Sequence, residues 1–109
     1  MEIKNIPFST LNWETISSEE HKGEEGKSIW RVVKQGNIRA RIVEYSPGYH
    51  ADHWCEKGHV VYVLEGEFTS ELKDGRKFTL TKGMSYLVAD NTAPHKSYTK
   101  KGVKLFIVD

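Results

Sequence analysis

The stretch HADHWCEKGHVVYVLEG, residues 50–66, places coordinating side chains directly before a nearly continuous apolar run. It holds three of the chain's five histidines and its single cysteine. A short apolar run bounded by turn residues is typical of a buried strand. Two linked questions follow: which fold contains this run, and what the coordinating side chains do beside it.

Strand-forming runs alternate with turn residues along most of the chain. Turn signals such as Gly36-Asn37 and Glu65-Gly66 recur, many of them about 8 to 12 residues apart, which is typical of an all-β sandwich or barrel. The segment FTSELKDGRKFTL reads as two strands joined by a two-residue Asp74-Gly75 turn. Further strands are expected in SIWRVV, NIRARIVEY, VVYVLEG, MSYLVA and VKLFIVD.

The length of 109 residues suits a single domain. We expect this domain to span residues 1–109, with an N-terminal strand and a polar loop over residues 1–28 and a barrel over residues 29–109. The polar stretch SSEEHKGEEGKS belongs to the expected loop. His21 within it is expected to be a solvated histidine.

Alternation predicts which side chains face the core. In NIRARIVEY, Ile38, Ala40 and Ile42 share one face, and Arg39 and Arg41 share the other. The arginines are expected in solvent, with the alternative that one reaches into the cavity and holds an anionic group. The aromatic residues expected mostly in the core are Trp30, Tyr62, Phe68, Tyr86 and Phe106.

Composition and charge exclude several classes of partner. Sixteen basic and fifteen acidic residues give a formal charge of +1, which offers no steering towards nucleic acid or an anionic membrane. No apolar run approaches the roughly 18 residues of a membrane span, and the first residues lack a signal-peptide pattern. A single cysteine cannot form an internal disulfide, so we expect a cytoplasmic location with Cys55 free to act as a ligand or nucleophile.

The spacing of the coordinating residues suggests a metal site. His53 and Cys55 point to the same face if they lie on a strand. A reversal at Glu56-Lys57-Gly58 brings His59 onto the neighbouring strand, and His95, which follows Pro94, can return to the same wall of the barrel. Burying these groups without partners is costly, and a metal ion satisfies them.

Two segments resemble the conserved blocks of the cupins: PGYHADHWCEKGHVVYVLEGEF, residues 47–68, and GMSYLVADNTAPHKS, residues 83–97. His53-Trp54-Cys55 stands in the His-x-His position of the first block, His59 in its Glu position, and Gly66 follows where the block ends in glycine. His95 matches the final histidine of the second block. The DHWC stretch further resembles the small group called DHCW-motif cupins.

This resemblance implies a double-stranded β-helix, a jelly-roll-like barrel of two packed antiparallel sheets. It also implies a metal site on His53, Cys55, His59 and His95, where most cupins use three histidines and a glutamate. The alternatives for the site are hydrogen-bonded histidines with an inert buried cysteine, or a catalytic thiol at Cys55. His50 is expected at the barrel rim, and Asp52 and Trp54 on the face opposite His53, with Trp54 in the core.

A thiolate with imidazoles favours zinc, with nickel, iron or copper as alternatives. Four protein ligands would close a zinc site and indicate a structural role, whereas an open position would admit a ligand. We therefore weigh three functions: a metal-dependent cupin that binds a small polar molecule and catalyses an unknown reaction, an iron-dependent dioxygenase, and a metal-free or structural-metal sensor. The expected partners are a small molecule and a second copy in a homodimer.

Overall fold

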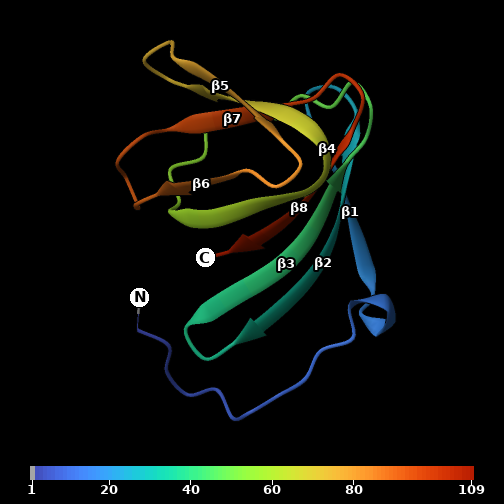
Figure 1. The fold of residues 1–109 in the computed structure, drawn as a ribbon, viewed down its shortest axis with the longest axis vertical. Helices are drawn as coiled ribbons and strands as arrows, with labels where there is room; N and C mark the ends of the chain where they lie inside the picture. The colour runs from blue at the N-terminus through green and yellow to red at the C-terminus, as the bar shows by residue number, and fades with distance from the viewer. Residues whose placement is uncertain (1) are drawn as a thin grey trace.

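The computed structural model describes residues 2–109, which form a barrel built almost wholly of β-strands (Figure 1). Its only helical element within this range is a short 3-10 helix, η1 (Trp13–Thr15). The strands are β1 (Ser18–Lys22), β2 (Lys27–Gln35), β3 (Ile38–Tyr45), β4 (His59–Leu72), β5 (Lys77–Thr81), β6 (Ser85–Val88), β7 (His95–Tyr98) and β8 (Val103–Val108).

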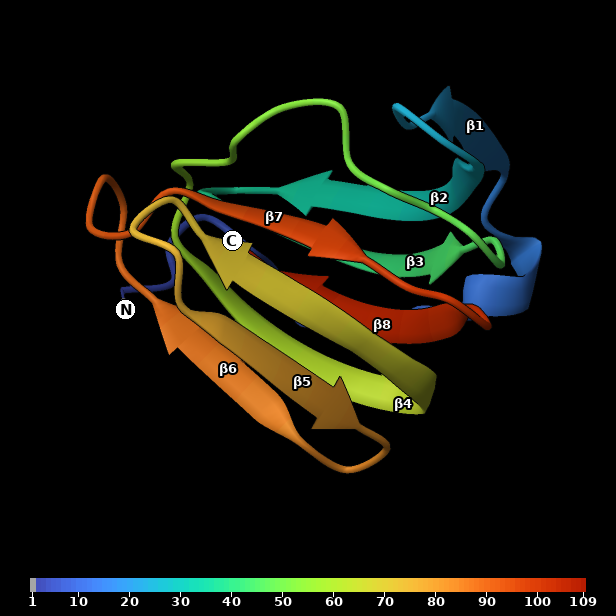
Figure 2. The ribbon, with the colours of Figure 1, turned by 90° about the horizontal axis from the view of Figure 1, so that it is seen from above.

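The strands form two antiparallel sheets that share β4. Sheet A has the order β1-β2-β3-β8-β4-β6, and sheet B has the order β7-β4-β5. Seen from above, β1 and β6 lie at opposite edges of the molecule (Figure 2). The expected barrel of two packed antiparallel sheets is confirmed.

A bend in β4 produces the two-sheet architecture. The first part of β4 pairs with β8 and the second with β5 and β7, and the register shifts between Val63 and Glu65. Gly66 has φ +81°, and a Cβ atom there would clash with the carbonyl oxygen of Gly102. The Glu65-Gly66 pair, expected to separate two strands, therefore bends one continuous strand, as Figure 1 shows.

The core lies between the sheets and follows the alternation along the strands. Odd-numbered residues at the start of β4, including Val61 and Val63, are buried, while Val60 and Tyr62 face outward. The hairpin expected around Asp74-Gly75 is present and joins β4 to β5, with the amide of Leu72 donating to the carbonyl of Arg76. The buried apolar residues are Val43, Val61, Val63, Phe68, Leu80, Val103, Leu105 and Ile107.

The prediction of a loop over SSEEHKGEEGKS is wrong for its first part. Residues Ser18–Lys22 form β1, which pairs with β2 along its full length although all five residues are exposed. Main-chain pairing with a sheet edge needs no apolar side chain, so the hydrophobic pattern could not reveal this strand. The N-terminal strand expected before it is replaced by η1 and irregular chain.

The expected orientation of β3 is also wrong. Val43 is fully buried and Arg41 is 6% exposed, so the face that carries the arginines points into the barrel. The carboxylate of Asp109 accepts hydrogen bonds from Arg39 and Arg41, which compensates the cost of placing their charges there. The structure instead agrees with the alternative expectation, because Arg39 and Arg41 both border the cavity.

The core aromatics are confirmed in part. Phe68 is buried, and Trp30 and Tyr86 pack against the core. Tyr62 is 43% exposed because it lies on the outward face of β4. Phe106, one position out of phase with buried Leu105, also lies on the outer face of sheet A, where its ring packs edge-on against Trp13.

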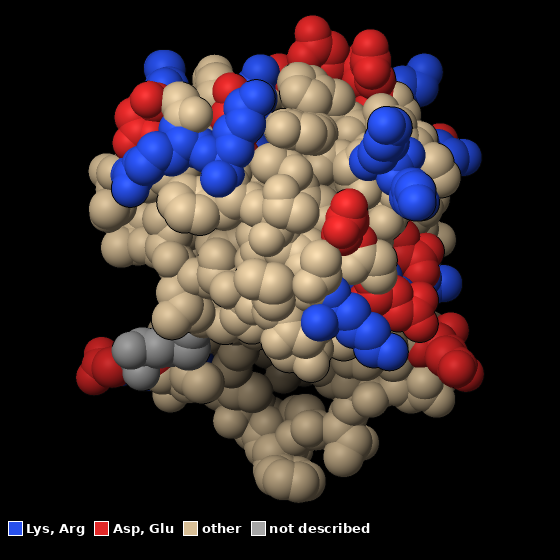
Figure 3. All heavy atoms as spheres, turned by 45° about the horizontal axis from the view of Figure 1, so that its top comes forward, with Lys and Arg blue, Asp and Glu red and all other residues tan. Residues whose placement is uncertain are grey.

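Other expectations concern partners and location. No helix within residues 2–109 is long and apolar enough to cross a membrane. Acidic and basic side chains are intermixed on the face shown in Figure 3, as the near-balanced charge suggests. The homodimer and the assignment of residues 1–109 to one domain stay predictions.

The bend at Gly66 yields a test of the fold. Gly66→Ala places a methyl group against the backbone of Gly102 and also requires an unfavourable positive φ. Gly83 has φ +88° but open space around it, so Gly83→Ala isolates the cost of φ. We expect Gly83→Ala to lower the free energy of unfolding by about 1–2 kcal/mol, and Gly66→Ala by a further ~1–3 kcal/mol, measured by urea denaturation. Equal losses would show that the contact with Gly102 does not constrain the bend.

Candidate metal centre

Cys55, His59 and His95 bring three potential ligand atoms together inside the barrel. Their Sγ and imidazole nitrogen atoms all lie within 4.8 Å of one another. The Nε2 atom of His59 is 3.4 Å from Sγ of Cys55 and 3.2 Å from Nε2 of His95. His59 and His95 are buried and Cys55 is half-buried, so the group forms a compact site at the wall of the cavity.

The fold supplies these residues from three separate segments. His59 begins β4 and His95 begins β7, opposite Leu72 at the far end of β4. The bend of β4 therefore brings both ends of that strand to the same end of the barrel. Cys55 lies in the loop before β4, where its backbone exchanges two hydrogen bonds of 2.8 and 3.0 Å with the backbone of His95.

Hydrogen bonds on the far side of each imidazole orient both rings. The Nδ1 atom of His59 lies 2.9 Å from Oδ2 of Asp109, and Nδ1 of His95 lies 2.8 Å from the carbonyl oxygen of Ala93. Ionised carboxylates and carbonyls only accept hydrogen bonds, so each Nδ1 carries the proton. In the neutral rings, both Nε2 atoms then present lone pairs to the site, which is how metal-binding histidines are usually held.

The donor set fits a metal ion. Two Nε2 lone pairs that face each other repel unless a proton or a cation lies between them. Without a metal ion, a proton on Nε2 can instead be donated to the sulfur. Burial raises the pKa of the Cys55 thiol, but such hydrogen bonds from His59 and His95 outweigh this effect and lower it to about 5. The hydrogen bond to Cys55 in turn raises the pKa of His95. A thiolate and two oriented imidazoles are the ligands that zinc and other transition metals bind.

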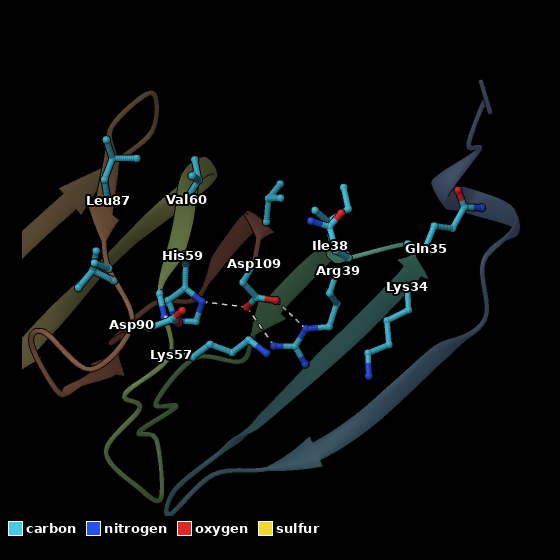
Figure 4. A pocket seen from close by; sticks show the side chains of 16 residues that line it. Lys34, Gln35, Ile38, Arg39, Lys57, His59, Val60, Leu87, Asp90 and Asp109 are labelled. Atoms are coloured by element: carbon cyan, nitrogen blue, oxygen red, sulfur yellow. Dashed lines mark hydrogen bonds and ion pairs between the residues drawn. The ribbon is translucent and has the colours of Figure 1, made fainter. Parts of the chain in front are cut away.

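Asp109 anchors the site. Its side chain is 1% exposed and accepts hydrogen bonds from His59, Arg39 and Arg41. Burial raises the pKa of this carboxyl, but the bonds from Arg39 and His59 and the charges of both arginines hold it well below the usual range. Figure 4 shows His59, Asp109 and Arg39 side by side. The sequence analysis did not find Asp109, since only its place after the final strand, beside the start of β4, distinguishes it.

His53 does not join the cluster. Its side chain is 77% exposed, and its Nδ1 pairs with the carboxylate of Asp52. The segment around His53 and Cys55 is not a regular strand, so the alternation that put both on one face does not apply. His53 still borders the same cavity, and its role as a fourth ligand stays a prediction. Trp54, expected in the core, is half-buried with the ammonium of Lys96 4.9 Å from its ring centre.

The two remaining histidines lie outside the cluster. His50 is about one-third exposed and its ring contacts Glu24 and Tyr98, close to the expected rim position. His21 lies on β1 instead of in a loop, and its ring packs against Trp30 at 4.3 Å between centres. Neither therefore offers a ligand atom to the group of Cys55, His59 and His95.

The cluster opens onto a cavity of about 320 Å³ between the two sheets. Trp30, Arg41 and Tyr45 line it from sheet A, and Lys96 and Ser97 line it from sheet B. This volume is at the lower end of the range typical of small-molecule sites. The interior therefore has room for a small ligand beside the three coordinating side chains.

No protein-family model matches the sequence, and no curated protein is significantly similar to it. Solved structures do resemble it. An RmlC-like cupin from Shewanella frigidimarina has a TM-score of 0.75 and 20% identity, over 96% of this chain and 92% of that one. Ectoine synthase from P. lautus has a TM-score of 0.77 and 18% identity, over 93% and 76% of the two chains.

The polyketide cyclase RemF from Streptomyces resistomycificus is similar to the same degree. Its TM-score is 0.75 and its identity 20%, over 94% of this chain and 78% of that one. At such identities the likeness concerns the fold alone. The further resemblance to the DHCW-motif group rests on the residues of the first block and stays a prediction.

The environment of Cys55 predicts its reactivity. In protein freed of metal by a chelator, the rate of alkylation by iodoacetamide should fall with a midpoint near pH 5 as the thiolate becomes protonated. An ordinary thiol gives a midpoint near ~8.5. Mass spectrometry can follow the single cysteine, with Cys55→Ser as the blank. A midpoint near that of an ordinary thiol would contradict stabilisation of the thiolate by the histidines.

The buried carboxylate of Asp109 can be tested separately. Asp109→Asn removes the negative charge between Arg39 and Arg41, and should lower the free energy of unfolding by about 3–5 kcal/mol. Asp74→Asn is the control, because Asp74 also pairs with an arginine but at the surface. Urea denaturation should show little change for the control, and a similarly small change for Asp109→Asn would contradict its anchoring role.

Proposed function

The chain has the cupin fold, and on this basis we propose that it holds a divalent transition metal on Cys55, His59 and His95 and binds a small polar molecule beside it. The convergence of both Nε2 atoms with the Cys55 sulfur supports the metal site. The adjoining cavity supports the small ligand. We propose that the protein is an enzyme, although neither the fold nor the cluster specifies its reaction.

Zinc is the metal best suited to one thiolate and two imidazoles, followed by nickel, iron and copper. Three protein ligands leave one tetrahedral position for water or a ligand, which is the arrangement of catalytic zinc sites. Were His53 to supply a fourth ligand, the site would close and a structural role would be favoured. The exposure of His53 supports the open site.

A metal ion in this position would act as a Lewis acid on a bound carbonyl, carboxylate or water. The chain's own residues prepare the site for it. Asp109 and the carbonyl of Ala93 hold the Nδ1 protons of His59 and His95, so the Nε2 atoms keep their lone pairs directed at the site.

The names of structurally similar proteins do not select one reaction. They include a synthase, a cyclase and a sugar phosphate isomerase from Silicibacter pomeroyi, which has a TM-score of 0.70. One fold can host many functions, and other similar structures, such as the Cnp3 cupin domain from Schizosaccharomyces pombe, carry no enzyme name, so the site itself has to carry the proposal. A dioxygenase has no specific support, because a thiolate is an unusual ligand for that iron chemistry.

A nucleophilic thiol is the second candidate. The Nε2 atom of His59 lies 3.4 Å from Sγ of Cys55, within reach of a base that activates a nucleophile. The two candidates differ in the effect of zinc, which would occupy the sulfur and protect Cys55 from alkylation. A thiol enzyme would keep its reactive cysteine when zinc is added.

Metal analysis tests the proposal. Protein purified without chelator, or reloaded with zinc, should hold about one equivalent of metal by elemental mass spectrometry. Cys55→Ser and His95→Ala should each raise the Kd for the metal at least about tenfold, since each removes a ligand, corresponding to more than ~1.4 kcal/mol. Cobalt substitution should give a sulfur-to-metal charge-transfer band that disappears in Cys55→Ser.

Two matched controls sharpen the result. His21→Ala removes a histidine on exposed β1 and should leave metal binding unchanged. His53→Ala should also keep the bound metal if the site has three protein ligands. Failure of the unaltered protein to bind zinc, nickel, iron or copper would refute the metal function, whereas loss of binding in His53→Ala would indicate the closed, four-ligand site.

A further inference from the structure

The cavity beside the cluster is lined by basic side chains. Arg39, Arg41, Lys57 and Lys96 all border it, and within the described part of the chain its lining includes no aspartate or glutamate. Asp109 lies behind Arg39 and Arg41, not on the cavity wall. A small enclosed space with this charge favours an anionic occupant.

Arg41 is the buried cation of this group. Its side chain is 7% exposed, and its guanidinium lies 4.4 Å from the ring centre of Trp30. Its Nη2 atom donates a hydrogen bond to Oδ2 of Asp109, while Nε is buried without a partner. A buried guanidinium with an unpaired donor is unfavourable, and Arg41 borders the cavity, where a ligand could accept hydrogen bonds from its accessible N–H groups.

Asp109 balances only part of the positive charge. Arg39 occupies both of its carboxylate oxygens, through Nε at 2.8 Å and Nη2 at 3.0 Å. Oδ2 also accepts a hydrogen bond from Nδ1 of His59. One negative charge thus stands against two guanidinium groups. The Cys55 thiolate also borders the cavity, but so do the ammonium groups of Lys57 and Lys96, so positive groups outnumber negative ones there.

We propose that the cavity binds a small ligand through a carboxylate group, which accepts hydrogen bonds from the Arg41 guanidinium. This proposal deepens the proposed function. The carboxylate end of the ligand would bind Arg41, and only the other end, which would face Cys55, His59 and His95, depends on the proposed metal site. The substrate class is therefore a small carboxylic acid with a second polar group.

A carboxylate matches this position better than a phosphate. Both anions can pair with a guanidinium, but a carboxylate carries a single charge, which costs less to transfer from water into the cavity than the larger charge of phosphate. The cavity, at about 320 Å³, suits a molecule of modest size. Phosphate, with its greater charge, is the competing anion that the experiment must separate.

The test uses the unaltered full chain, labelled with ¹⁵N, and three probes: propionate, its neutral isostere propionamide, and inorganic phosphate. In metal-free protein, propionate should shift the Nε–H resonance of Arg41, assigned by its absence from the Arg41→Met spectrum. Propionamide should produce no such shift. Equal effects of propionate and propionamide, or a response to phosphate alone, would overturn the proposal.

Substitutions at Arg41 test its contribution to the affinity for propionate. Propionate should raise the melting temperature of the unaltered protein, and its Kd should be about 10- to 100-fold weaker in Arg41→Lys, which keeps the charge but loses the planar donors. Arg76→Met is the control, because Arg76 is exposed and pairs only with Asp74. Unchanged affinity in Arg41→Lys would contradict the proposal, and the resonance shift in the unaltered protein decides it if the variant fails to fold.

The outcome is separable from that of the metal function. Cobalt binding is measured on the same preparation without propionate, and propionate binding is measured without cobalt. A shift of Arg41 in protein that binds no metal would uphold the carboxylate site and refute the metal centre. Metal binding without any shift of the Arg41 resonance would uphold the metal centre and refute the carboxylate site.

Discussion

The buried carboxylate of Asp109 is the interaction on which the interior of the barrel depends. It sits where β3, β4 and β8 meet and accepts from Arg39, Arg41 and His59. A lone buried anion would be strongly unfavourable, and so would two unpaired guanidinium groups. Together they allow charged groups in the interior of a barrel whose core is otherwise mostly aliphatic and aromatic.

This carboxylate also links two parts of the site that have different tasks. The same oxygen, Oδ2, accepts from Nδ1 of His59 and from Nη2 of Arg41. A change of charge at the cluster therefore alters the electrostatic environment of the guanidinium, and a change at the guanidinium alters the basicity of the imidazole. Metal and anion sites arranged in this way are coupled through one shared acceptor, and binding at one favours or opposes binding at the other.

Local patterns in the sequence predicted the fold class, the hairpin at Asp74-Gly75 and the strand starts that carry His59 and His95. Turn residues and alternation act over a few positions, and these features depend on them. The inward face of β3 was missed because it depends on Asp109, which lies 68 residues from Arg41. His53 was placed beside Cys55 on the assumption of a regular strand, whereas the loop there turns its side chain towards solvent.

The bend of β4 at Gly66 makes the two ends of the barrel mechanically unequal. At the bend, β4 runs from one sheet into the other, pairing with β8 up to Gly66 and with β5 from Glu67, with a register shift between Val63 and Glu65. At the opposite end, loops and the three side chains of the cluster connect the sheets. Breathing motions should thus concentrate at the cluster end, with Gly66 as the hinge. A metal ion bound by both His59 and His95, which are 36 residues apart, would cross-link the sheets at this end. Its binding and release would control the exchange of small molecules with the interior.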